Sequence, residues 1–104
     1  MSELRLTARA QFEIRTAARW YAEQSPRTAS RFLAAVDDTL GMLIRTPRLW
    51  PLHSHGARRA LLRRFPYWLY YREYDNTVNV VAVVHTRRRA DAWRRQVDAH
   101  EGGD

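Results

Sequence analysis

The sequence contains no cysteine, no lysine and only four glycines in 104 residues. Without cysteine the protein has no disulfide, no zinc–thiolate site and no thiol nucleophile. With so few glycines, two of them near the C-terminal end, a glycine-rich phosphate-binding loop is excluded. No run of eighteen or more apolar residues occurs, so no membrane span is expected. These absences exclude several large classes of enzyme and of membrane protein.

The first sixteen residues, MSELRLTARAQFEIRT, alternate charged and apolar residues and lack the continuous apolar stretch of a signal peptide. We therefore expect a cytoplasmic protein. Hydrophobic residues make up 45% of the chain, which is ample for one core, so disorder is not expected. The length predicts a single domain over residues 1–104, with residues 98–104 as a frayed tail.

All eighteen basic residues are arginines, and they face eleven acidic residues, for a formal net charge of +7. The planar guanidinium group makes paired hydrogen bonds to carboxylates, phosphates and base edges. A GC-rich genome would also favour arginine over lysine, and surface charge also serves solubility. The positive excess nevertheless indicates an anionic partner. It is concentrated in residues 57–95, which carry ten arginines and three acids.

Residues 3–7 alternate as a short strand does, and Thr7 is suited to cap a following helix over residues 8–24. Ser25-Pro26 ends that helix and starts a second one, which Thr46-Pro47 ends. Apolar residues recur at helical spacing in both segments. The predicted buried stripes are Ala10, Ile14, Ala17, Ala18 and Tyr21 in the first helix, and Ala29, Phe32, Leu33, Val36, Leu40, Leu43 and Ile44 in the second.

After a proline-containing loop over residues 45–56, the apolar period changes to two, which is typical of strands. We predict strands over residues 57–65, 66–74 and 77–85, the last two joined by a tight hairpin at Asp75-Asn76. A short helix through Val97 completes the pattern. The fold class is therefore α+β: an N-terminal strand and an antiparallel helical hairpin packed on an antiparallel β-sheet, with a short C-terminal helix or tail.

Few side chains suggest catalysis. His53 and His55 have a spacing that occurs at metal sites, but they lie in a loop with no cysteine and no nearby carboxylate. Asp37 and Asp38 are adjacent on a helix and point about 100° apart, so they read as a solvated helix face rather than a catalytic pair. No serine lies in a nucleophile motif. The sequence therefore predicts neither a metal site nor a cofactor.

Basic residues gather on the first strand after the loop and after the last strand. These candidate binding residues are Arg58, Arg59, Arg63, Arg64, His85, Arg87, Arg88, Arg89 and Trp93. The aromatic residues between them are Phe65, Tyr67, Trp68, Tyr70, Tyr71 and Tyr74. Arginines with stackable rings suit RNA or single-stranded DNA. Alternate aromatics on a central strand are more often core, and we expect at least three of the six to be buried.

Four stretches in series resemble the toxins of the RelE/ParE superfamily, the toxic halves of bacterial type II toxin–antitoxin pairs. They are LTARAQFEI, ARWYAEQSPRTASRFL, LLRRFPYWLYYRE and VVAVVHTRRRADAW, which together span roughly residues 4–93. The resemblance implies a helical hairpin against a curved antiparallel sheet, in agreement with the pattern of elements above.

The superfamily contains two activities. RelE-like members cut messenger RNA on the ribosome with basic side chains and usually a terminal tyrosine, whereas ParE-like members poison DNA gyrase. Two lysines of the RelE-like set fall on Arg59 and Leu61, and an arginine of the next strand falls on Trp68. A later arginine is kept as Arg87, but the tyrosine falls on Trp93, whose indole has no acid–base chemistry near neutral pH. The resemblance therefore favours the ParE-like branch.

The ParE-like reading implies a toxin that inhibits DNA gyrase and is neutralised by a cognate antitoxin with an acidic C-terminal segment. Operator DNA would then be reached only through the antitoxin, and the nine candidate binding residues would contact a protein. One alternative is a ribosome-dependent mRNA endoribonuclease that uses Arg59, Arg63, His85 and Arg87. Another is a nontoxic binding or corepressor module.

Overall fold

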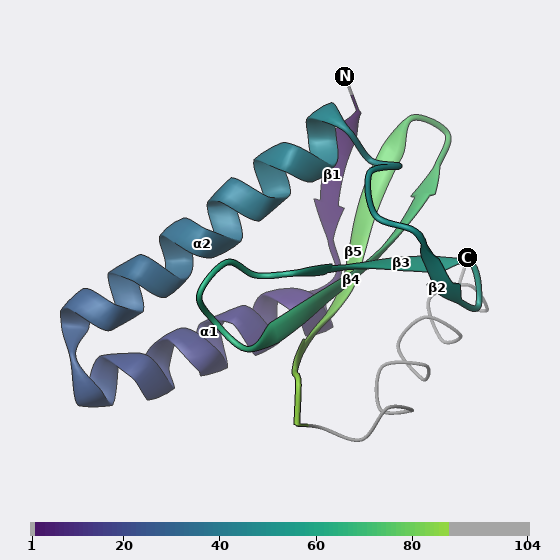
Figure 1. The fold of residues 1–104 in the computed structure, drawn as a ribbon. Coiled ribbons are helices and arrows are strands. Elements are labelled where there is room, and N and C mark those ends of the chain that lie inside the picture. Colours follow the sequence, from purple (N-terminus) through teal and green to yellow (C-terminus); the bar gives the residue numbers. More distant parts are fainter. Residues whose placement is uncertain (1, 88–104) are drawn as a thin grey trace.

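The structure is a computed structural model that describes residues 2–87. Two helices form an antiparallel hairpin beside a five-stranded sheet (Figure 1). The elements are β1 (Glu3–Leu6), α1 (Ala8–Gln24), α2 (Pro26–Arg45), β2 (Leu52–Ser54), β3 (Ala57–Leu61), β4 (Tyr67–Tyr74) and β5 (Thr77–His85). The predicted α+β class is confirmed. The predicted C-terminal helix lies outside the described residues.

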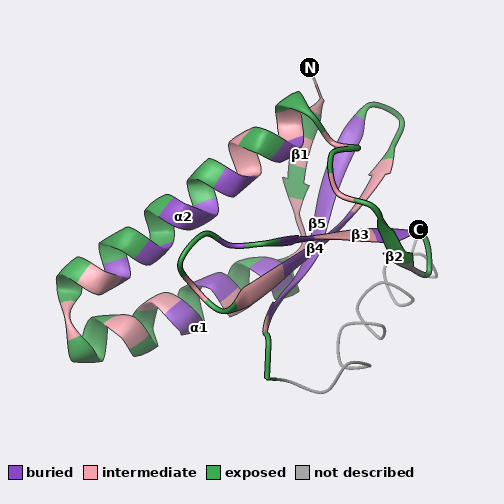
Figure 2. Ribbon diagram, viewed as in Figure 1, coloured by how far each residue is buried: buried purple, intermediate pink, exposed green. Residues whose placement is uncertain are grey.

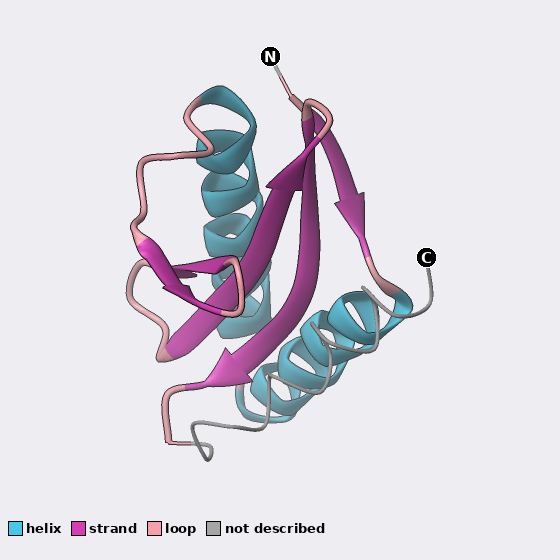
Figure 3. Ribbon diagram, turned by 90° about the vertical axis from the view of Figure 1, so that its right-hand side faces the viewer, coloured by secondary structure: helices cyan, strands magenta, loops and turns pink. Residues whose placement is uncertain are grey.

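The sheet has the strand order β1-β5-β4-β3-β2. Strands β3, β4 and β5 pair in antiparallel fashion, as predicted, and β2 adds a further antiparallel pair with β3. Strand β1 pairs with β5 in parallel and makes the sheet mixed. A parallel pair needs a long connection, and the whole helical hairpin and the other strands lie between β1 and β5. The strands are strongly twisted, and β5 bends along its length (Figure 3).

Both helices begin at the predicted caps. The Thr7 hydroxyl accepts a hydrogen bond from the Ala10 N–H at 3.1 Å, and the Ser25 hydroxyl accepts one from the Thr28 N–H at 3.4 Å. Pro26 occupies the first turn of α2, where its missing N–H costs nothing. These caps satisfy backbone donors that would otherwise be orphaned. The interhelix turn is therefore built from the Ser25-Pro26 pair that the sequence predicted.

The buried stripe of α2 differs from the prediction most at Leu33, while Leu40 and Ile44 are half-buried. Leu33 was expected to be buried, but 43% of its surface is exposed. Phe32, Val36 and Leu43 face the core, and Leu33 lies about 100° around the helix from Phe32, on the side away from the sheet. Thr39 is buried instead, because its hydroxyl donates to the Ala35 carbonyl at 2.9 Å and so needs no solvent.

The turns between strands depend on residues with positive φ. Asp75 and Asn76 have φ of 47° and 59°, as a two-residue hairpin requires, which confirms the predicted hairpin. The prediction of a strand over residues 57–65 was wrong beyond Leu61, where β3 ends. Arg64 has a φ of 70°, which is incompatible with a strand, so the chain turns there before β4. The predicted loop contains the short strand β2.

The core lies on both faces of the sheet. One cluster joins the two helices to Leu69, Tyr71 and Val80, and a second contains Tyr70, Ala82 and Val84. Strand β5 is consequently buried along nearly its whole length (Figure 2). Of the six aromatics for which at least three burials were expected, only two are fully buried, while three others are half-buried. The buried pair is Tyr70 and Tyr71, and the half-buried residues are Phe65, Tyr67 and Trp68.

Among the described residues, no helix combines the length and the apolar character that crossing a membrane requires.

Candidate partner-binding site

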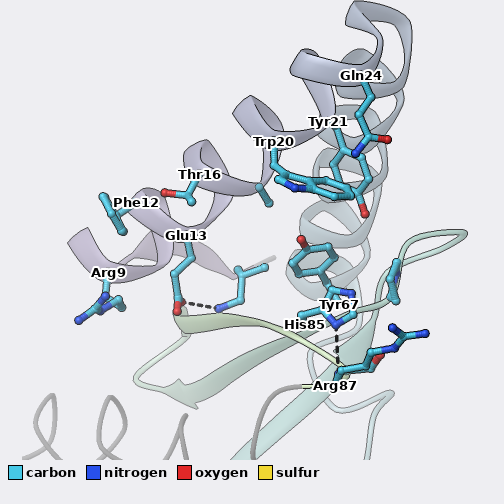
Figure 4. A pocket seen from close by; sticks show the side chains of 14 residues that line it. Arg9, Phe12, Glu13, Thr16, Trp20, Tyr21, Gln24, Tyr67, His85 and Arg87 are labelled. Atoms are coloured by element: carbon cyan, nitrogen blue, oxygen red, sulfur yellow. Dashed lines mark hydrogen bonds between the residues drawn. The ribbon is translucent and has the colours of Figure 1, made fainter.

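A groove of about 790 Å³ runs between α1 and the C-terminal end of β5 (Figure 4). Helix α1 contributes Phe12 and Trp20, and the sheet contributes Tyr67, His85 and the following Arg87. We call it the α1–β5 groove. Phe12 and Trp20 expose 53% and 54% of their surface, although both are large and apolar. Exposed apolar side chains gathered in a concave surface are typical of a site that binds another molecule.

The groove exists because β1 is short. The pairing of β1 with β5 reaches only Val80, after which the chain leaves the sheet at Thr7 to begin α1. Thr7 closes the junction, with its N–H donating to the Val80 carbonyl at 3.0 Å and its hydroxyl to the Val81 carbonyl at 3.3 Å. Beyond this point α1, not a strand, lies beside the outer edge of β5. The groove occupies the place that a longer β1 would fill.

Glu13 takes part in closing this edge. Its carboxylate accepts a hydrogen bond from the Val83 N–H at 2.8 Å (Figure 4). A β-bulge at Val81 shifts the register of β5 against β4, between the pairs Tyr70–Ala82 and Tyr71–Val80. The bulge changes which N–H groups point outward, so Val83 presents one to α1. Glu13 therefore supplies the acceptor that a neighbouring strand would have provided.

At the other end of the groove, His85 packs against an aromatic cluster. The rings of His85 and Tyr67 lie edge to face with centroids 5.1 Å apart, and Tyr67 in turn contacts Phe32 and Tyr21. The Nδ1 atom of His85 accepts a hydrogen bond from the Arg87 N–H at 3.1 Å. This bond requires Nδ1 to carry no proton, and it turns the chain directly after β5. His85 thus positions the backbone of Arg87 at the rim of the groove.

Two of the candidate arginines lie on β3 and make intramolecular contacts. The Arg58 guanidinium donates to the Trp50 carbonyl at 2.6 Å and so holds the loop before β2. The Arg59 guanidinium stacks over the Trp68 ring, 3.8 Å from its centroid. Arg58 pairs with Tyr71 across the strands, and Arg59 pairs with Tyr70, so the two side chains point to opposite faces of the sheet. Adjacent sequence positions therefore do not form one basic surface here.

The candidate residues Arg63 and Arg64 lie in the turn after β3 and not on the strand predicted over residues 57–65. Arg63 and Arg64 line a second groove of about 610 Å³ between this turn and α2. Its further lining includes Thr28, Arg31, Asp38 and Phe65. We call it the arginine groove. Arg31 was not among the predicted binding residues, because on the sequence it is one charge on the polar face of a helix.

The structure therefore divides the predicted basic residues among four places: Arg58 at the loop before β2, Arg59 on the opposite face of the sheet, Arg63 and Arg64 in the arginine groove, and His85 with Arg87 at the α1–β5 groove. Arg88, Arg89 and Trp93 lie outside the described residues.

The positions that resemble the RelE-like nuclease set can be placed on the sheet. Arg59 and Leu61 alternate on β3, and Leu61 pairs directly with Trp68 on β4, so all three share one face. His85 pairs with Tyr67, whose neighbour Trp68 points to the other side, so His85 and Arg59 are on opposite faces. The face that carries Arg59 presents a leucine and an indole at the two positions where the nuclease set has charges.

Phe12, Trp20 and Glu13 line the α1–β5 groove but were not among the predicted binding residues. All three lie off the apolar stripe of α1, and exposed aromatics on an otherwise polar helix face were the available signal. Within residues 2–87, no group of three or more histidine, aspartate or glutamate side chains could hold a metal ion. His53 lies near Tyr70, with ring centroids 6.2 Å apart, and the His55 carbonyl accepts from the Arg72 guanidinium at 2.7 Å.

Comparison with known proteins identifies the architecture. The sequence model for the family described as "ParE toxin of type II toxin-antitoxin system, parDE" matches residues 4–90. The comparison with curated protein sequences gives no match.

Three solved structures are similar to this chain. The chromosomal ParDE system from P. aeruginosa superposes with a TM-score of 0.74 at 16% identity, covering 84% of this chain and 98% of that one. The intact E. coli RelBE toxin–antitoxin complex gives 0.61 at 20% identity, covering 85% and 100%. The RelBE2 toxin–antitoxin complex from Mycobacterium tuberculosis gives 0.52 at 30% identity, covering 86% and 93%.

Proposed function

Because this chain belongs to the ParE toxin family of type II toxin–antitoxin systems, we propose that it inhibits DNA gyrase, arrests growth and is neutralised by a cognate antitoxin. The toxin acts in this proposal by binding a protein, without a cofactor. It reaches operator DNA only through its antitoxin.

The α1–β5 groove is the observation that carries the antitoxin part of the proposal. It combines exposed Phe12 and Trp20 with Arg9 and Arg87, which also line it. A partner segment with apolar side chains would bury both rings, and acidic residues beside them would meet the two arginines. Each large apolar side chain that becomes buried contributes about 1.5–3 kcal/mol. A segment that folds on binding can use this gain to offset the entropy it loses.

The face that carries Arg59 supports gyrase over messenger RNA as the target. Cleavage of RNA through the 2′-hydroxyl needs a base to activate that group and positive charge to stabilise the phosphorane. Leu61 and Trp68 can supply neither, and Arg59 is stacked on the Trp68 ring. His85, the general base of the nuclease alternative, lies on the opposite face from Arg59. These residues fit a surface that binds a protein better than one that cleaves RNA.

Inducible expression in a bacterial host tests the target directly. We expect viability to fall, with double-strand DNA breaks and an SOS response, because a poisoned gyrase leaves cleaved DNA. The double variant Arg59→Gln/His85→Gln provides the control for the nuclease alternative, since it removes the charge on one face and the general base on the other. This variant should remain folded. If it is less toxic, cellular messenger RNA should still be as intact as after expression of the unmodified protein.

Each alternative has its own outcome in this experiment. Cleaved messages and halted translation without DNA breaks would show a ribonuclease that uses Arg59, Arg63, His85 and Arg87. Normal growth with abundant folded protein would show a nontoxic binding or corepressor module. Either result would refute gyrase inhibition.

A further inference from the structure

The lining of the arginine groove carries three positive side chains and one negative side chain. Arg31 comes from α2, and Arg63 and Arg64 come from the turn between β3 and β4. Asp38 is the single acidic residue in the lining. Within residues 2–87, no ion pair joins any of these three guanidinium groups to a carboxylate, Asp38 included. Three like charges at one site repel each other, so an anionic ligand that enters gains both attraction and relief of that repulsion.

The groove has an apolar wall as well as its charges. Phe65 lines it and is fixed in place by Tyr21 and Phe32, with ring centroids 5.1 Å and 5.4 Å away. Ala34 and Ala35 of α2 add small apolar side chains to the lining. The volume of about 610 Å³ is within the range of about 300–1,000 Å³ that is usual for ligand sites. A ligand for this surface therefore has apolar groups beside its negative charges.

The chemistry favours a peptide over a nucleic acid. Arginine pairs its donors with both carboxylates and phosphates, so the arginines alone do not distinguish a peptide from a nucleic acid. Asp38 would repel a continuous phosphate backbone, whereas a peptide can place a neutral residue beside it. The wall formed by Phe65 and the alanines suits an aliphatic side chain. Carboxylates interspersed with apolar residues satisfy every part of the lining.

The arginine groove is separate from the α1–β5 groove. The turn between β3 and β4 divides them: Arg63, Arg64 and Phe65 line the former, while Pro66 and Tyr67 line the latter. The two grooves share no lining residue. A partner can therefore occupy one without displacing anything from the other.

We propose that the arginine groove is a second docking site, which binds a carboxylate-rich peptide segment of a protein partner through Arg31, Arg63 and Arg64. The inference rests on the proposed function only for the identity of that partner, the antitoxin. It is independent of which cellular target the toxin inhibits.

The test uses purified full-length protein and a short synthetic peptide of repeated Glu-Glu-Leu units, with affinity measured by titration calorimetry. The test variant is Arg31→Gln/Arg63→Gln/Arg64→Gln. The matched control is Arg5→Gln/Arg15→Gln/Arg19→Gln, which changes three exposed arginines that line neither groove. Both variants lower the formal net charge by three, from +7 to +4. Circular dichroism is used to check that both variants are folded.

We expect the groove variant to weaken peptide binding about 10- to 100-fold, because three exposed guanidinium–carboxylate contacts are lost, and the control to change it much less. Equal weakening in both variants would show a general charge effect and overturn the proposal. Absence of peptide binding to the unmodified protein would also overturn it. So would tighter, groove-dependent binding of an oligothymidylate, which would identify a nucleic-acid site. None of these outcomes depends on toxicity, so failure here is distinguishable from failure of the proposed function.

Discussion

At the residue scale, the Glu13 side chain holds the outer edge of β5. Its carboxylate accepts the Val83 N–H at 2.8 Å, at the edge of the sheet that β1 leaves uncovered. A buried N–H without an acceptor is costly, whereas the carboxylate would be fully solvated in the unfolded chain. Glu13 therefore stabilises the end of β5 and, with it, one wall of the α1–β5 groove.

Replacement of Glu13 by alanine should lower the free energy of unfolding by about 1–3 kcal/mol, because the Val83 N–H loses its acceptor. Glu13→Gln keeps an amide oxygen at the same position and should cost less. Glu23→Ala, at the exposed end of α1, is the control and should stay within about 0.5 kcal/mol of the unmodified protein. Urea denaturation measures all three. Equal stability of Glu13→Ala and Glu23→Ala would show that the hydrogen bond contributes nothing.

Ionisation of the Tyr71 phenol is coupled to folding. Tyr71 is completely buried, and its hydroxyl donates to the Pro47 carbonyl at 2.7 Å. Burial raises the pKa of Tyr71 from 10.0 to about 12, and the nearby Arg58 opposes the rise. The folded state therefore holds the proton more tightly than the unfolded state does. The resulting stability is present below pH 10 and is lost as the pH rises from 10 through about 12.

Stability measured against pH should show this loss. The free energy of unfolding should fall between pH 10 and about 12, and Tyr71→Phe should fall less steeply over the same interval, because it has no phenol to ionise. At neutral pH the variant should be less stable by about 0.5–1.5 kcal/mol, the usual net value of one hydrogen bond. Tyr74→Phe, at an exposed position, controls for tyrosine titration in general. Parallel curves for the unmodified protein and Tyr71→Phe would contradict the coupling.

At the scale of elements, α1 both packs in the core and lines the α1–β5 groove. Ala10, Ile14 and Ala17 are buried in the core, while the exposed Phe12 and Trp20 line the α1–β5 groove. Because about half of the surface of Phe12 and Trp20 is exposed, substitutions of these two residues should leave folding largely intact. The helix can therefore be tested as a binding surface.

The variant Phe12→Ser/Trp20→Ser should bind the antitoxin more weakly, because two large apolar side chains no longer become buried. Truncation of such anchors at interfaces costs about 2 kcal/mol or more each. The measurement is growth rescue on co-expression with the product of a neighbouring open reading frame, followed by co-purification. Leu33→Ser, an exposed apolar residue of α2 that lines neither groove, is the matched control. Full rescue of the double variant would place the antitoxin elsewhere on the surface.

At the scale of the whole molecule, the charge governs how partners arrive. The net charge of +7 attracts an acidic segment over a distance set by the Debye length, about 10 Å at 0.1 M salt. Apolar contacts of Phe12 and Trp20 in the α1–β5 groove depend little on salt, whereas contacts of the partner with arginines weaken as salt is added. Arrival and retention of a partner should thus respond differently to ionic strength.

The association rate of toxin and antitoxin should fall about tenfold or more between roughly 0.05 M and 0.5 M salt, while the dissociation rate rises by a smaller factor. Stopped-flow tryptophan fluorescence, to which the exposed Trp20 of the groove contributes, follows both rates. The variant Arg5→Gln/Arg15→Gln/Arg19→Gln should show a smaller salt dependence, because its net charge is lower. A rate that is independent of salt would exclude electrostatic steering.

Much of the fold follows from local sequence. The Thr7 and Ser25 caps, the helical stripes and the Asp75-Asn76 turn each depend on neighbours a few residues apart, and all are present in the structure. Composition likewise limited the function to a protein without thiol chemistry. The four motifs in series pointed to the toxin superfamily, which the match over residues 4–90 confirms.

Tertiary structure alone decided where the two grooves are. Sequence placed Arg58, Arg59, Arg63 and Arg64 on one strand, but the turn at Arg64 and the alternation of β3 send them to different sides of the molecule. The α1–β5 groove depends on where β1 stops beside β5, and the arginine groove depends on α2 approaching a turn about 30 residues away in the sequence. Such contacts between distant segments depend on the whole fold, because no local pattern records which elements will become neighbours.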